Sequence, residues 1–565
     1  MLSIPQQYNH ETFLKSDYND IEWIKYYTSK ISLKGYKNEE DLSDIYYNRA
    51  KHYFRLEEYI NSKNDLEISQ KMLPNDNNLV SLAFIYEKLG DDKKSLLFLQ
   101  DYKKKNSNDE FINDYIDSIV NDCDDIVKKD FQKLKEWLVS NNSNLNNVKI
   151  KYYTNENREI FSQKNIKKNE TILEIPLDCM ITTELGKQTD IGREVIDKNL
   201  KLDSNHNWIS FVLLENLNKS DSKWRKYIDI LPKNFKTVPI FLKRYYLNKL
   251  IGSAGLDKIL FKIKSLKTDY DFLNNNIEEF KKYTFAEYIW ARTVVITRIF
   301  GIVIDGIKTQ ALVPFADMLN HNSDSETQWF FDDDKMIFKI ISKNEISQNI
   351  PICDSYGKKC NSRFFVNYGF VLDRNMQNIS KFKFDLNFPE VVKLNKNLLN
   401  MTHDIGIIEQ NSNNFNNFLS IVRYYVCKDS SLFNKSLSIF LVPISKENEI
   451  NSLKYIMRVC IKHLKNYNTT IKNDLDILLN PLHKYNRKYS NIRNCIIMRY
   501  GEKYIYDYYI KMASICIKLL SLDFEKLVES NLLLDSLSGN YYLYVSDSIC
   551  ELLNKDGKLD KYLFE

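Results

Sequence analysis

The sequence has no long apolar run, no cysteine pair and no strong net charge. No stretch approaches the ~18 consecutive apolar residues that a membrane-spanning helix needs, and the opening MLSIPQQYNHETF lacks the basic-then-apolar layout of a secretory signal. The net charge of +5 comes from 80 basic and 75 acidic residues, too weak a bias to indicate nucleic acid. We therefore expect no membrane and no direct nucleic-acid partner, and a cytoplasmic protein with the nucleus as the alternative.

The nine cysteines are scattered without a CxxC pair. This argues against a disulfide framework or a closed zinc site and favours reduced thiols. Cys353 and Cys360 have no cluster of further ligands near them in the sequence, so we interpret them as packing residues and expect no metal. At 565 residues the chain is too long for a single core, which predicts two to four domains.

An approximate repeat lies within residues 43–105. A period of 33 residues, small residues at crossing points and an aromatic on the first helix are typical of stacked helical hairpins. The repeated residues are Ala50, Tyr53, Ser62 and Leu66, which recur as Ala83, Tyr86, Ser95 and Leu99. The pattern resembles a tetratricopeptide-type repeat, capped by helices near 13–32 and 109–125. Two interpretations stay open with equal weight: a surface that binds a peptide or protein partner, or a helical support.

The rest of the chain alternates between strand-like and helical patterns. A helix is predicted over 131–138, and short strands over 148–153, 158–162 and 171–177. Helical periodicity returns over 190–300, strands and turns follow from 311 to about 372, and the pattern beyond 385 is helical. The fold class expected is α+β, with helical regions on both sides of a β region that carries a helical insert.

Two motifs place polar residues inside apolar runs. ALVPFADMLNHN (311–322) ends in Asn and His, and DSYGKKCNSRFFVNYGF (354–370) carries two tyrosines that each precede a glycine. Polar groups in such runs require partners. Upstream lie SKWRKYIDILP (222–232) and ITRIF (296–300). An arginine fork suits a carboxylate, and an Asn amide offers a donor and an acceptor together, as an adenine edge requires.

These motifs resemble the SET-domain methyltransferases of the branch that contains the RuBisCO large-subunit lysine methyltransferase and the actin-histidine methyltransferase. The resemblance runs from about 127 to the end and includes YNTTIKNDLDIL in the C-terminal region. It implies a SET fold of short twisted sheets with a knotted core. It also implies a SET domain over 126–375 with an insert at about 190–300, and a helical substrate-binding domain over 385–565. Residues 1–125 lie outside this resemblance, and the tetratricopeptide-like repeat predicts a helical domain there.

The resemblance also implies S-adenosylmethionine as cofactor and a protein substrate with a target lysine. Tyr368 matches the catalytic tyrosine, and Tyr356 a second tyrosine that lines the target channel. Asn320 and His321 match the pair that holds adenine, and Arg298 the arginine that grips the cofactor's carboxylate. The full set of implied cofactor residues is Glu156, Asn157, Arg158, Arg298, Asp317, Met318, Leu319, Asn320, His321, Tyr368, Gly369 and Phe370.

One departure from the family concerns its Gly-x-Gly turn, where this chain has Asn157 and Glu159. Glycine there allows close approach to the cofactor and positive φ, for which Asn is the best substitute. Two alternatives to a lysine methyltransferase follow. One is a histidine methyltransferase, against which Tyr368 argues because that branch has a small residue at this position. The other is an inactive repeat-bearing scaffold.

Overall fold

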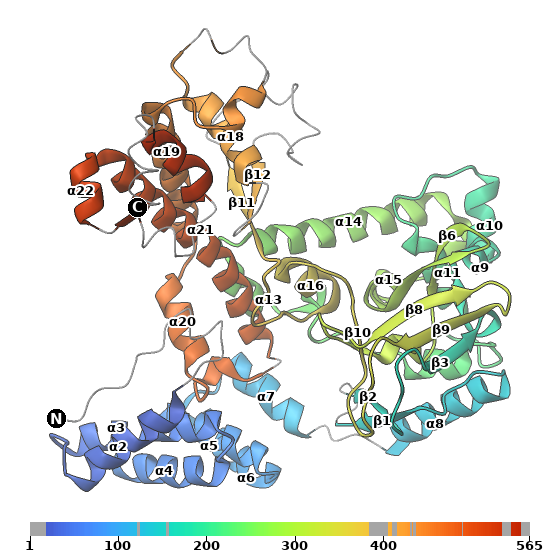
Figure 1. The fold of residues 1–565 in the computed structure, drawn as a ribbon. Helices are drawn as coiled ribbons and strands as arrows, with labels where there is room; N and C mark the ends of the chain where they lie inside the picture. Colours follow the sequence, from blue (N-terminus) through green and yellow to red (C-terminus); the bar gives the residue numbers. More distant parts are fainter. Residues whose placement is uncertain are drawn as a thin grey trace.

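The computed structural model describes residues 19–120, 125–153, 158–383, 405–409, 415–429, 432, 437–488, 490–530, 532–533 and 544–554. Three lobes are visible in Figure 1: the N-terminal hairpins (residues 20–120), a β-rich lobe with a helical insert (residues 125–368) and a C-terminal lobe (residues 379–553). Helix α14 (Ala254–Asn276) connects the β-rich and C-terminal lobes, and α21 (Asn491–Ser521) descends from the C-terminal lobe to the hairpins. Among the described helices, none combines the length and apolar composition of a membrane span.

The N-terminal hairpins repeat one packing arrangement. The Ser62 hydroxyl donates to the Ala50 carbonyl at 2.7 Å, and the Ser95 hydroxyl donates to the Ala83 carbonyl at 2.9 Å. Leu66 and Leu99 are both completely buried. The residues that recur in the sequence therefore make equivalent contacts, although membership of the tetratricopeptide family stays a prediction. The helices are α2 (Asp20–Ser32), α3 (Glu39–Arg55), α4 (Tyr59–Met72), α5 (Asp76–Lys88), α6 (Asp92–Lys105) and α7 (Glu110–Val120).

The β-rich lobe follows α8 (Asp125–Ser140) and consists of small sheets. Strand β1 pairs with β2, the order of the two three-stranded sheets is β3-β9-β8 and β4-β6-β5, and the two-residue strands β7 and β10 pair in parallel. Three strands lie where the sequence predicts them, namely β1 (Val148–Tyr152), β2 (Arg158–Ser162) and β3 (Thr171–Pro176). The others are β4 (Ile181–Thr182), β5 (Ile299–Ile304), β6 (Ile307–Leu312), β7 (Asn320–His321), β8 (Thr327–Asp332), β9 (Ile337–Ser342) and β10 (Cys353–Asp354).

Two of the predicted boundaries are wrong. Strands resume at Ile299, not at 311, because the β-branched run IFGIVI forms β5 and turns back at Asp305–Gly306, where both residues have positive φ. The region beyond 385 is not uniformly helical, because β12 (Ile405–Glu409) pairs with β11 (Ile379–Lys383) in an antiparallel hairpin. In both cases pairing with another strand decides the structure of a short apolar run: β5 pairs with β6 across a two-residue turn, and β12 pairs with β11.

The insert between β4 and β5 is helical, as expected. Its longer helices are α10 (Asp190–Asp197), α11 (His206–Asn216), α14 and α15 (Phe285–Arg298), with the shorter α9 (Thr183–Lys187), α12 (Arg225–Ile230) and α13 (Arg244–Leu247). After β10, α16 (Asn361–Tyr368) leads to the C-terminal lobe. That lobe contains α18 (Phe415–Val426), α19 (Lys446–Leu464), α20 (Ile471–Leu479), α21, α22 (Phe524–Glu529) and α25 (Cys550–Leu553).

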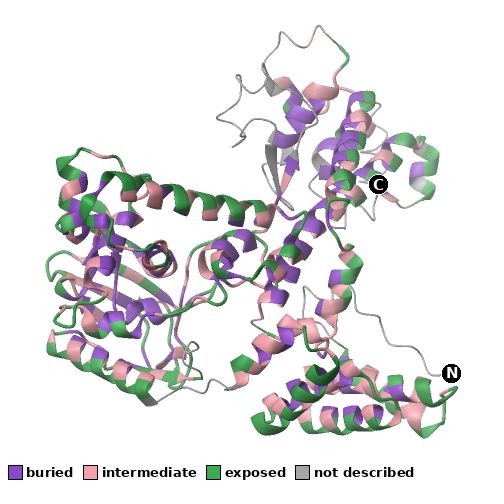
Figure 2. Ribbon diagram, turned by 180° about the vertical axis from the view of Figure 1, so that it is seen from behind, coloured by how far each residue is buried: buried purple, intermediate pink, exposed green. Residues whose placement is uncertain are grey.

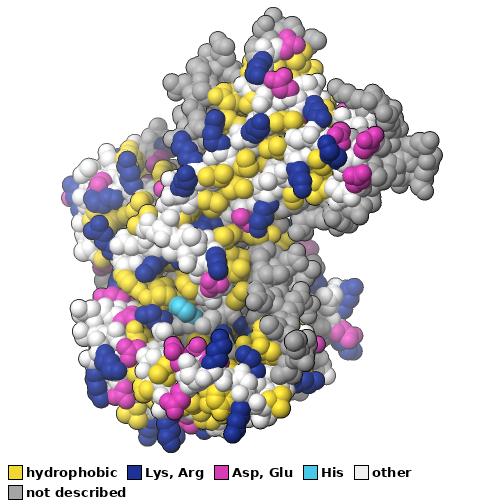
Figure 3. All heavy atoms as spheres, turned by 90° about the vertical axis from the view of Figure 1, so that its left-hand side faces the viewer, with side chains coloured by type: hydrophobic (Ala, Val, Ile, Leu, Met, Phe, Trp, Pro, Cys, Tyr) yellow, Lys and Arg dark blue, Asp and Glu magenta, His cyan; other side chains and the backbone are white. Residues whose placement is uncertain are grey.

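Buried residues gather in the strands of the β-rich lobe and along α21 (Figure 2). One apolar cluster crosses the lobes: it joins Phe84 of α5 and Tyr115 of α7 to Phe365 of α16 and Cys495 of α21. The hairpins are thus part of a continuous core with the helix that ends at Tyr368. On the face in Figure 3, Lys and Arg side chains are accompanied by Asp and Glu in both the upper and lower parts, consistent with the small net charge.

Candidate active site

The stretch 311–322 turns sharply after β6. Phe315, completely buried, has φ 72° at the start of a short 3-10 helix (Ala316–Met318) that leads into β7. A bulky residue in the left-handed region costs of order 1–3 kcal/mol and persists only where the surrounding structure enforces it. Strand β7 then pairs with β10, with Asn320 opposite Cys353 and His321 opposite Asp354. The turn and the parallel pair bring the two sequence motifs together.

Asp317 lies at the centre of a buried ionic network. The Arg298 guanidinium Nη1 donates to the Asp317 carboxylate at 3.0 Å and to the Asp317 carbonyl at 3.1 Å, and the Tyr227 hydroxyl donates to the same carboxylate oxygen at 2.7 Å. Burial, followed by the charge of Asp317, raises the pKa of Tyr227 well above its usual value. Tyr227 therefore stays a neutral donor. The network fixes Arg298 at the end of α15, beside the 3-10 helix.

Arg158, the first residue of β2, adds a second buried cation. Its guanidinium carbon lies 4.6 Å from the ring centroid of Phe131. Burial and the nearby Arg298 lower the pKa of Arg158 to about 10, and Asp317 opposes this shift. The Asn320 amide donates to the Arg158 carbonyl at 3.4 Å, which links β7 to β2. The site thus holds more positive than negative charge, as a site for a carboxylate requires.

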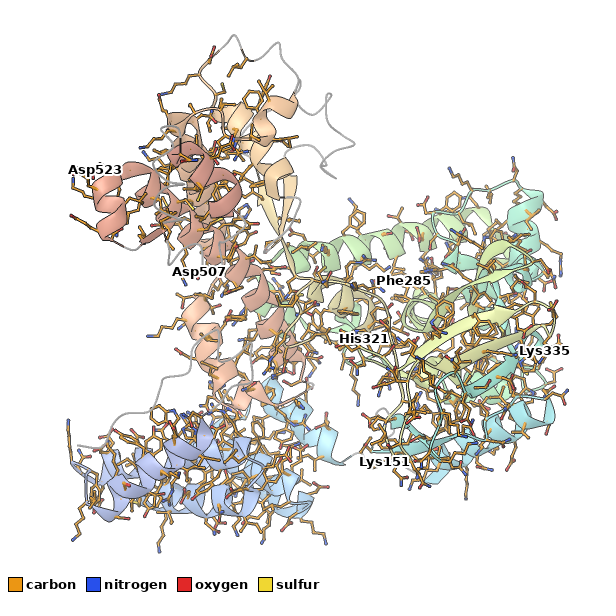
Figure 4. All side chains as sticks on the ribbon, in the orientation of Figure 1. Lys151, Phe285, His321, Lys335, Asp507 and Asp523 are labelled. Carbon is orange, nitrogen blue, oxygen red and sulfur yellow. The ribbon has the colours of Figure 1, made fainter. Side chains whose placement is uncertain are left out.

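His321 is held in a defined tautomer. Its Nδ1 accepts a hydrogen bond from the Tyr356 backbone N–H at 3.1 Å, so in the neutral ring the proton resides on Nε2. Burial lowers the pKa of His321, which favours this neutral form. The ring centroid lies 4.7 Å from that of Phe364 and 5.2 Å from that of Tyr356. In Figure 4, His321 lies on the inner side of the β-rich lobe, close to α16.

The two tyrosines form a pair beside His321. Their ring centroids are 5.0 Å apart, and the Tyr356 hydroxyl donates to the Leu319 carbonyl at 2.7 Å, which fixes its ring. Burial raises the pKa of both hydroxyl groups, so both stay protonated at neutral pH. Lys359 adds an amine at this point: its Nζ donates to the Tyr356 carbonyl and lies 5.9 Å from the Tyr368 ring centroid.

Buried polar atoms without a partner concentrate here. Among the described residues, 12 buried side-chain N or O atoms lack a hydrogen-bond partner. Four of them belong to this site: Arg158 Nε, Arg298 Nε, Asp317 Oδ1 and His321 Nε2. Because buried polar groups are nearly always paired in native proteins, such a concentration indicates a ligand with complementary groups. Two guanidinium donors fit a carboxylate, and the Asn320 amide with the neighbouring β7 backbone fits an adenine edge.

The structure places most of the predicted site residues together, although their roles remain predictions. One region is surrounded by seven of them: Arg158, Arg298, Asp317, Asn320, His321, Tyr356 and Tyr368. The ring centroid of Phe370 lies 5.8 Å from that of His321. Met318 and Leu319 are buried, and the Leu319 carbonyl accepts from the Tyr356 hydroxyl. Gly369 ends α16 with φ 81°. Glu156 and Asn157 lie outside the described residues.

Three residues of the candidate site were not predicted from the sequence: Tyr227, Phe364 and Lys359. Tyr227 was within a quoted motif, but nothing in the sequence connects it to Asp317, 90 residues later. Phe364 is one turn before Tyr368 on α16, and helical spacing could have suggested that both face His321. Lys359 follows Tyr356 by three residues within the predicted motif. The described residues contain no cluster of potential metal ligands, and their cysteines, including Cys353 and Cys360, are all free.

Two family models match separate parts of the chain, one in the β-rich lobe and one in the C-terminal lobe. A family model described as "SET domain" matches residues 157–357, and one described as "Rubisco LSMT substrate-binding" matches residues 393–505. An actin-histidine N-methyltransferase of Danio rerio is 25% identical over 470 residues, covering 77% of this chain and 74% of the relative. A ribosomal lysine N-methyltransferase of Schizosaccharomyces pombe is 28% identical over 221 residues, covering 38% and 40% respectively.

The solved structures agree in fold. The SET domain of LSMT bound to lysine and AdoHcy superimposes with a TM-score of 0.58 at 19% identity, covering 78% of this chain and 99% of that structure. The covered share of this chain is larger than either the β-rich lobe or the C-terminal lobe alone.

Proposed function

The chain belongs to the SET-domain methyltransferases that carry a Rubisco LSMT substrate-binding domain, and on that premise we propose that it methylates a lysine side chain of a protein substrate with S-adenosylmethionine as cofactor. The observation that carries the proposal is the Tyr356–Tyr368 pair beside the unpartnered buried atoms of Arg158, Arg298 and His321. A ligand that carries a carboxylate and an adenine matches those atoms, and the tyrosine pair provides hydroxyl groups that can orient an amine.

The cofactor supplies the methyl group when it is bound. Arg158 and Arg298 would hold its carboxylate, and Asn320 with the β7 backbone its adenine. The Arg298–Asp317–Tyr227 network keeps one guanidinium in a fixed orientation, which reduces the ordering cost at binding. The His321 Nε2–H adds a neutral donor on the same side.

The tyrosines act by position and by excluding water. Lysine has a pKa of roughly 10.4 in solution, so the target amine must lose a proton before it can attack. Burial beside the tyrosine pair would favour the neutral amine. Both hydroxyl groups keep their protons and therefore orient the nitrogen as hydrogen-bond partners and do not serve as bases at neutral pH. The proton passes to water as the amine enters. Correct alignment is the main catalytic contribution in such a transfer.

A groove between α14 and α16 offers a place for the protein substrate close to Tyr368. It has a volume of about 520 Å³ and is lined by Lys258, Lys262, Arg363 and Lys381, with Asp257 as the acidic member, together with Phe261, Ser362, Val366 and Asn367. Phe261 is 74% exposed. Basic side chains around an exposed aromatic ring favour a substrate segment that combines acidic and apolar residues.

Histidine is the second candidate target. It is supported by the actin-histidine relative, which covers more of this chain than the ribosomal lysine relative does. Tyr368 supports lysine, because the resemblance places a small residue at this position in the histidine branch.

The test is transfer of labelled methyl from S-adenosylmethionine into a native lysate, followed by identification of the modified side chain by mass spectrometry. We expect methyllysine; methylhistidine as the product would overturn the lysine assignment in favour of the second candidate. Tyr368→Phe should reduce turnover sharply, with cofactor binding measured by calorimetry largely intact. Absence of cofactor binding to the unmodified chain would instead support an inactive scaffold.

A further inference from the structure

Helices α3, α5 and α7, the first helix of each N-terminal hairpin, form one face, and a segment of the C-terminal lobe covers this face. The covering piece is the 479–487 segment, which connects α20 to α21 and lies directly on the hairpins in Figure 1. Helices α3, α5 and α7 all contribute contacts to it. These contacts come from Tyr47, Arg55, Ser81, Leu82, Glu87, Phe111 and Tyr115, with Tyr102 and Asp109 at the α6–α7 junction.

Leu482 is the apolar anchor of the segment. It is 1% exposed and lies in a cluster whose other buried members are all hairpin residues, among them Ala50, Leu66 and Tyr86. The Ser81 hydroxyl donates to the Leu482 carbonyl at 2.9 Å. A leucine side chain from another lobe thus completes the core of the hairpins, which ties their stability to the position of the segment.

Two basic residues fix the other half of the segment. The Lys484 Nζ donates to the Asp109 carboxylate and to the Tyr102 hydroxyl, each at 3.1 Å. Arg487 makes two hydrogen bonds to the Glu87 carboxylate, at 2.9 and 3.3 Å, and its guanidinium carbon lies 4.2 Å from the Tyr115 ring centroid. The hairpin face therefore contacts Leu482, Lys484 and Arg487 of the segment. Each of the two cations has an acidic and an aromatic partner on the face.

The segment leads directly into contacts around the candidate site. In the first turn of α21, the Asn491 amide donates to the Lys236 carbonyl at 3.0 Å, and the Asn494 amide donates to the Gly369 carbonyl at 3.2 Å. Arg493 forms a two-pronged pair with Asp373 at 2.7 and 2.9 Å. Gly369 directly follows Tyr368, the last residue of α16. The first turn of α21, which the segment leads into, therefore contacts the end of α16.

We propose that the N-terminal hairpins bind the 479–487 segment as an internal peptide ligand, and that this closes their binding face to partners in trans. Arrays of helical hairpins use such an extended face to bind peptides. Here the ligand is covalently attached, so its effective concentration is of order millimolar. A free peptide with the same contacts cannot compete at ordinary concentrations. On this proposal the hairpins act as a clamp on the C-terminal lobe, which corresponds to the helical-support interpretation of the repeat.

The test uses the full-length protein and a fluorescein-labelled peptide of residues 478–488, LLNPLHKYNRK, with fluorescence anisotropy as the readout. We expect no specific binding to the unmodified protein at micromolar concentrations. The variant K484E/R487E, which weakens the internal ligand, should bind the peptide at least tenfold more tightly. The matched control K511E/K518E changes the same number of charges on the exposed side of α21 and should behave like the unmodified protein.

Two further variants locate the binding face. Adding E87R to K484E/R487E should abolish peptide binding if the peptide enters the vacated face. E87R removes the partner of the peptide's arginine, and together with R487E it restores an ion pair between positions 87 and 487 with the charges exchanged. R487Q removes one charge without reversing it, so it weakens the contact between the segment and the hairpins less. It serves as the test variant if the double variant does not fold. Equal binding of the peptide to the unmodified protein and to the folded variants, or to none of them, would overturn the proposal. The readout does not involve methyl transfer, so it is independent of the proposed function.

Discussion

Asp317 supplies the negative charge next to two buried arginines. Its carboxylate pairs with Arg298 and accepts from Tyr227, whereas Arg158 has no acidic partner within hydrogen-bonding distance among the described residues. Burying charges is costly unless hydrogen bonds satisfy them. The Tyr227 hydroxyl is therefore part of what keeps the network stable, and it does so from α12 in the helical insert, far from the motif in the sequence.

Tyr227→Phe tests this at the scale of one hydrogen bond. Removal of the hydroxyl leaves a buried carboxylate without one of its donors, so we expect a loss of about 1.5–3 kcal/mol in the free energy of unfolding. Tyr153→Phe is the matched control: that hydroxyl also donates to a carboxylate, Glu159 at 2.9 Å, but the residue is 41% exposed. The control should lie within about 0.5 kcal/mol of the unmodified protein. Urea unfolding measures both, and equal losses would contradict the buried-network argument.

The residues that the sequence could predict are those whose chemistry is concentrated in short motifs. Asn320 and His321 follow an apolar run, and the Tyr-Gly pairs mark Tyr356 and Tyr368. Tyr227 differs, because its role depends on a helix crossing that no local spacing encodes. The same limit applies to the fold. Strands β1 to β3 have turns at both ends and were predicted, whereas β12 depends on pairing with β11. Strand β5 was missed although the Asp305–Gly306 turn that joins it to β6 is a local hairpin signal.

At the scale of elements, the end of α16 decides where Tyr368 lies. Gly369 has φ 81°, and a Cβ there would lie 2.6 Å from the Thr237 hydroxyl oxygen and 2.7 Å from its carbonyl carbon. The helix end and the 232–238 loop of the insert therefore approach each other more closely than any side chain permits. The Asn494 side-chain amide of α21 also donates a hydrogen bond to the Gly369 carbonyl.

Gly369→Ala should therefore displace Tyr368 as well as destabilise the fold. Gly306, in the β5–β6 turn, has φ 75°, but a Cβ added there would have no atom within 4 Å. Gly306→Ala isolates the backbone cost, about 1–2 kcal/mol. Gly369→Ala adds a backbone clash, so we expect a clearly larger loss and, in the fraction that stays folded, a lower kcat. Thermal unfolding and methyl transfer measure the two effects. Similar behaviour of the two variants would show that the close approach to Thr237 is unimportant.

At the scale of the whole molecule, the lobes share apolar cores, and each lobe contains a buried or half-buried histidine whose pKa is lowered. Burial lowers the pKa of His206 in the insert and of His483 in the 479–487 segment to about 4. The pKa of His52 in the hairpins and of His321 in the candidate site is lowered for the same reason. Histidine titrates near 6.5 when exposed. All three lobes therefore contain a histidine whose protonation opposes folding.

Stability should consequently fall as the pH drops from about 6.5 toward 4. In this range the unfolded chain binds protons at these histidines and the folded chain does not, so the free energy of unfolding rises with pH and its histidine contribution is complete above 6.5. His206→Gln removes one such proton. Near pH 5 the slope of the unfolding free energy against pH should become smaller by up to about 1.4 kcal/mol per pH unit. Urea unfolding from pH 4.5 to 7.5 measures this slope, with Lys264→Gln on the exposed side of α14 as a control that leaves the histidines unchanged. An unchanged slope in His206→Gln would mean that this histidine is protonated in the folded protein.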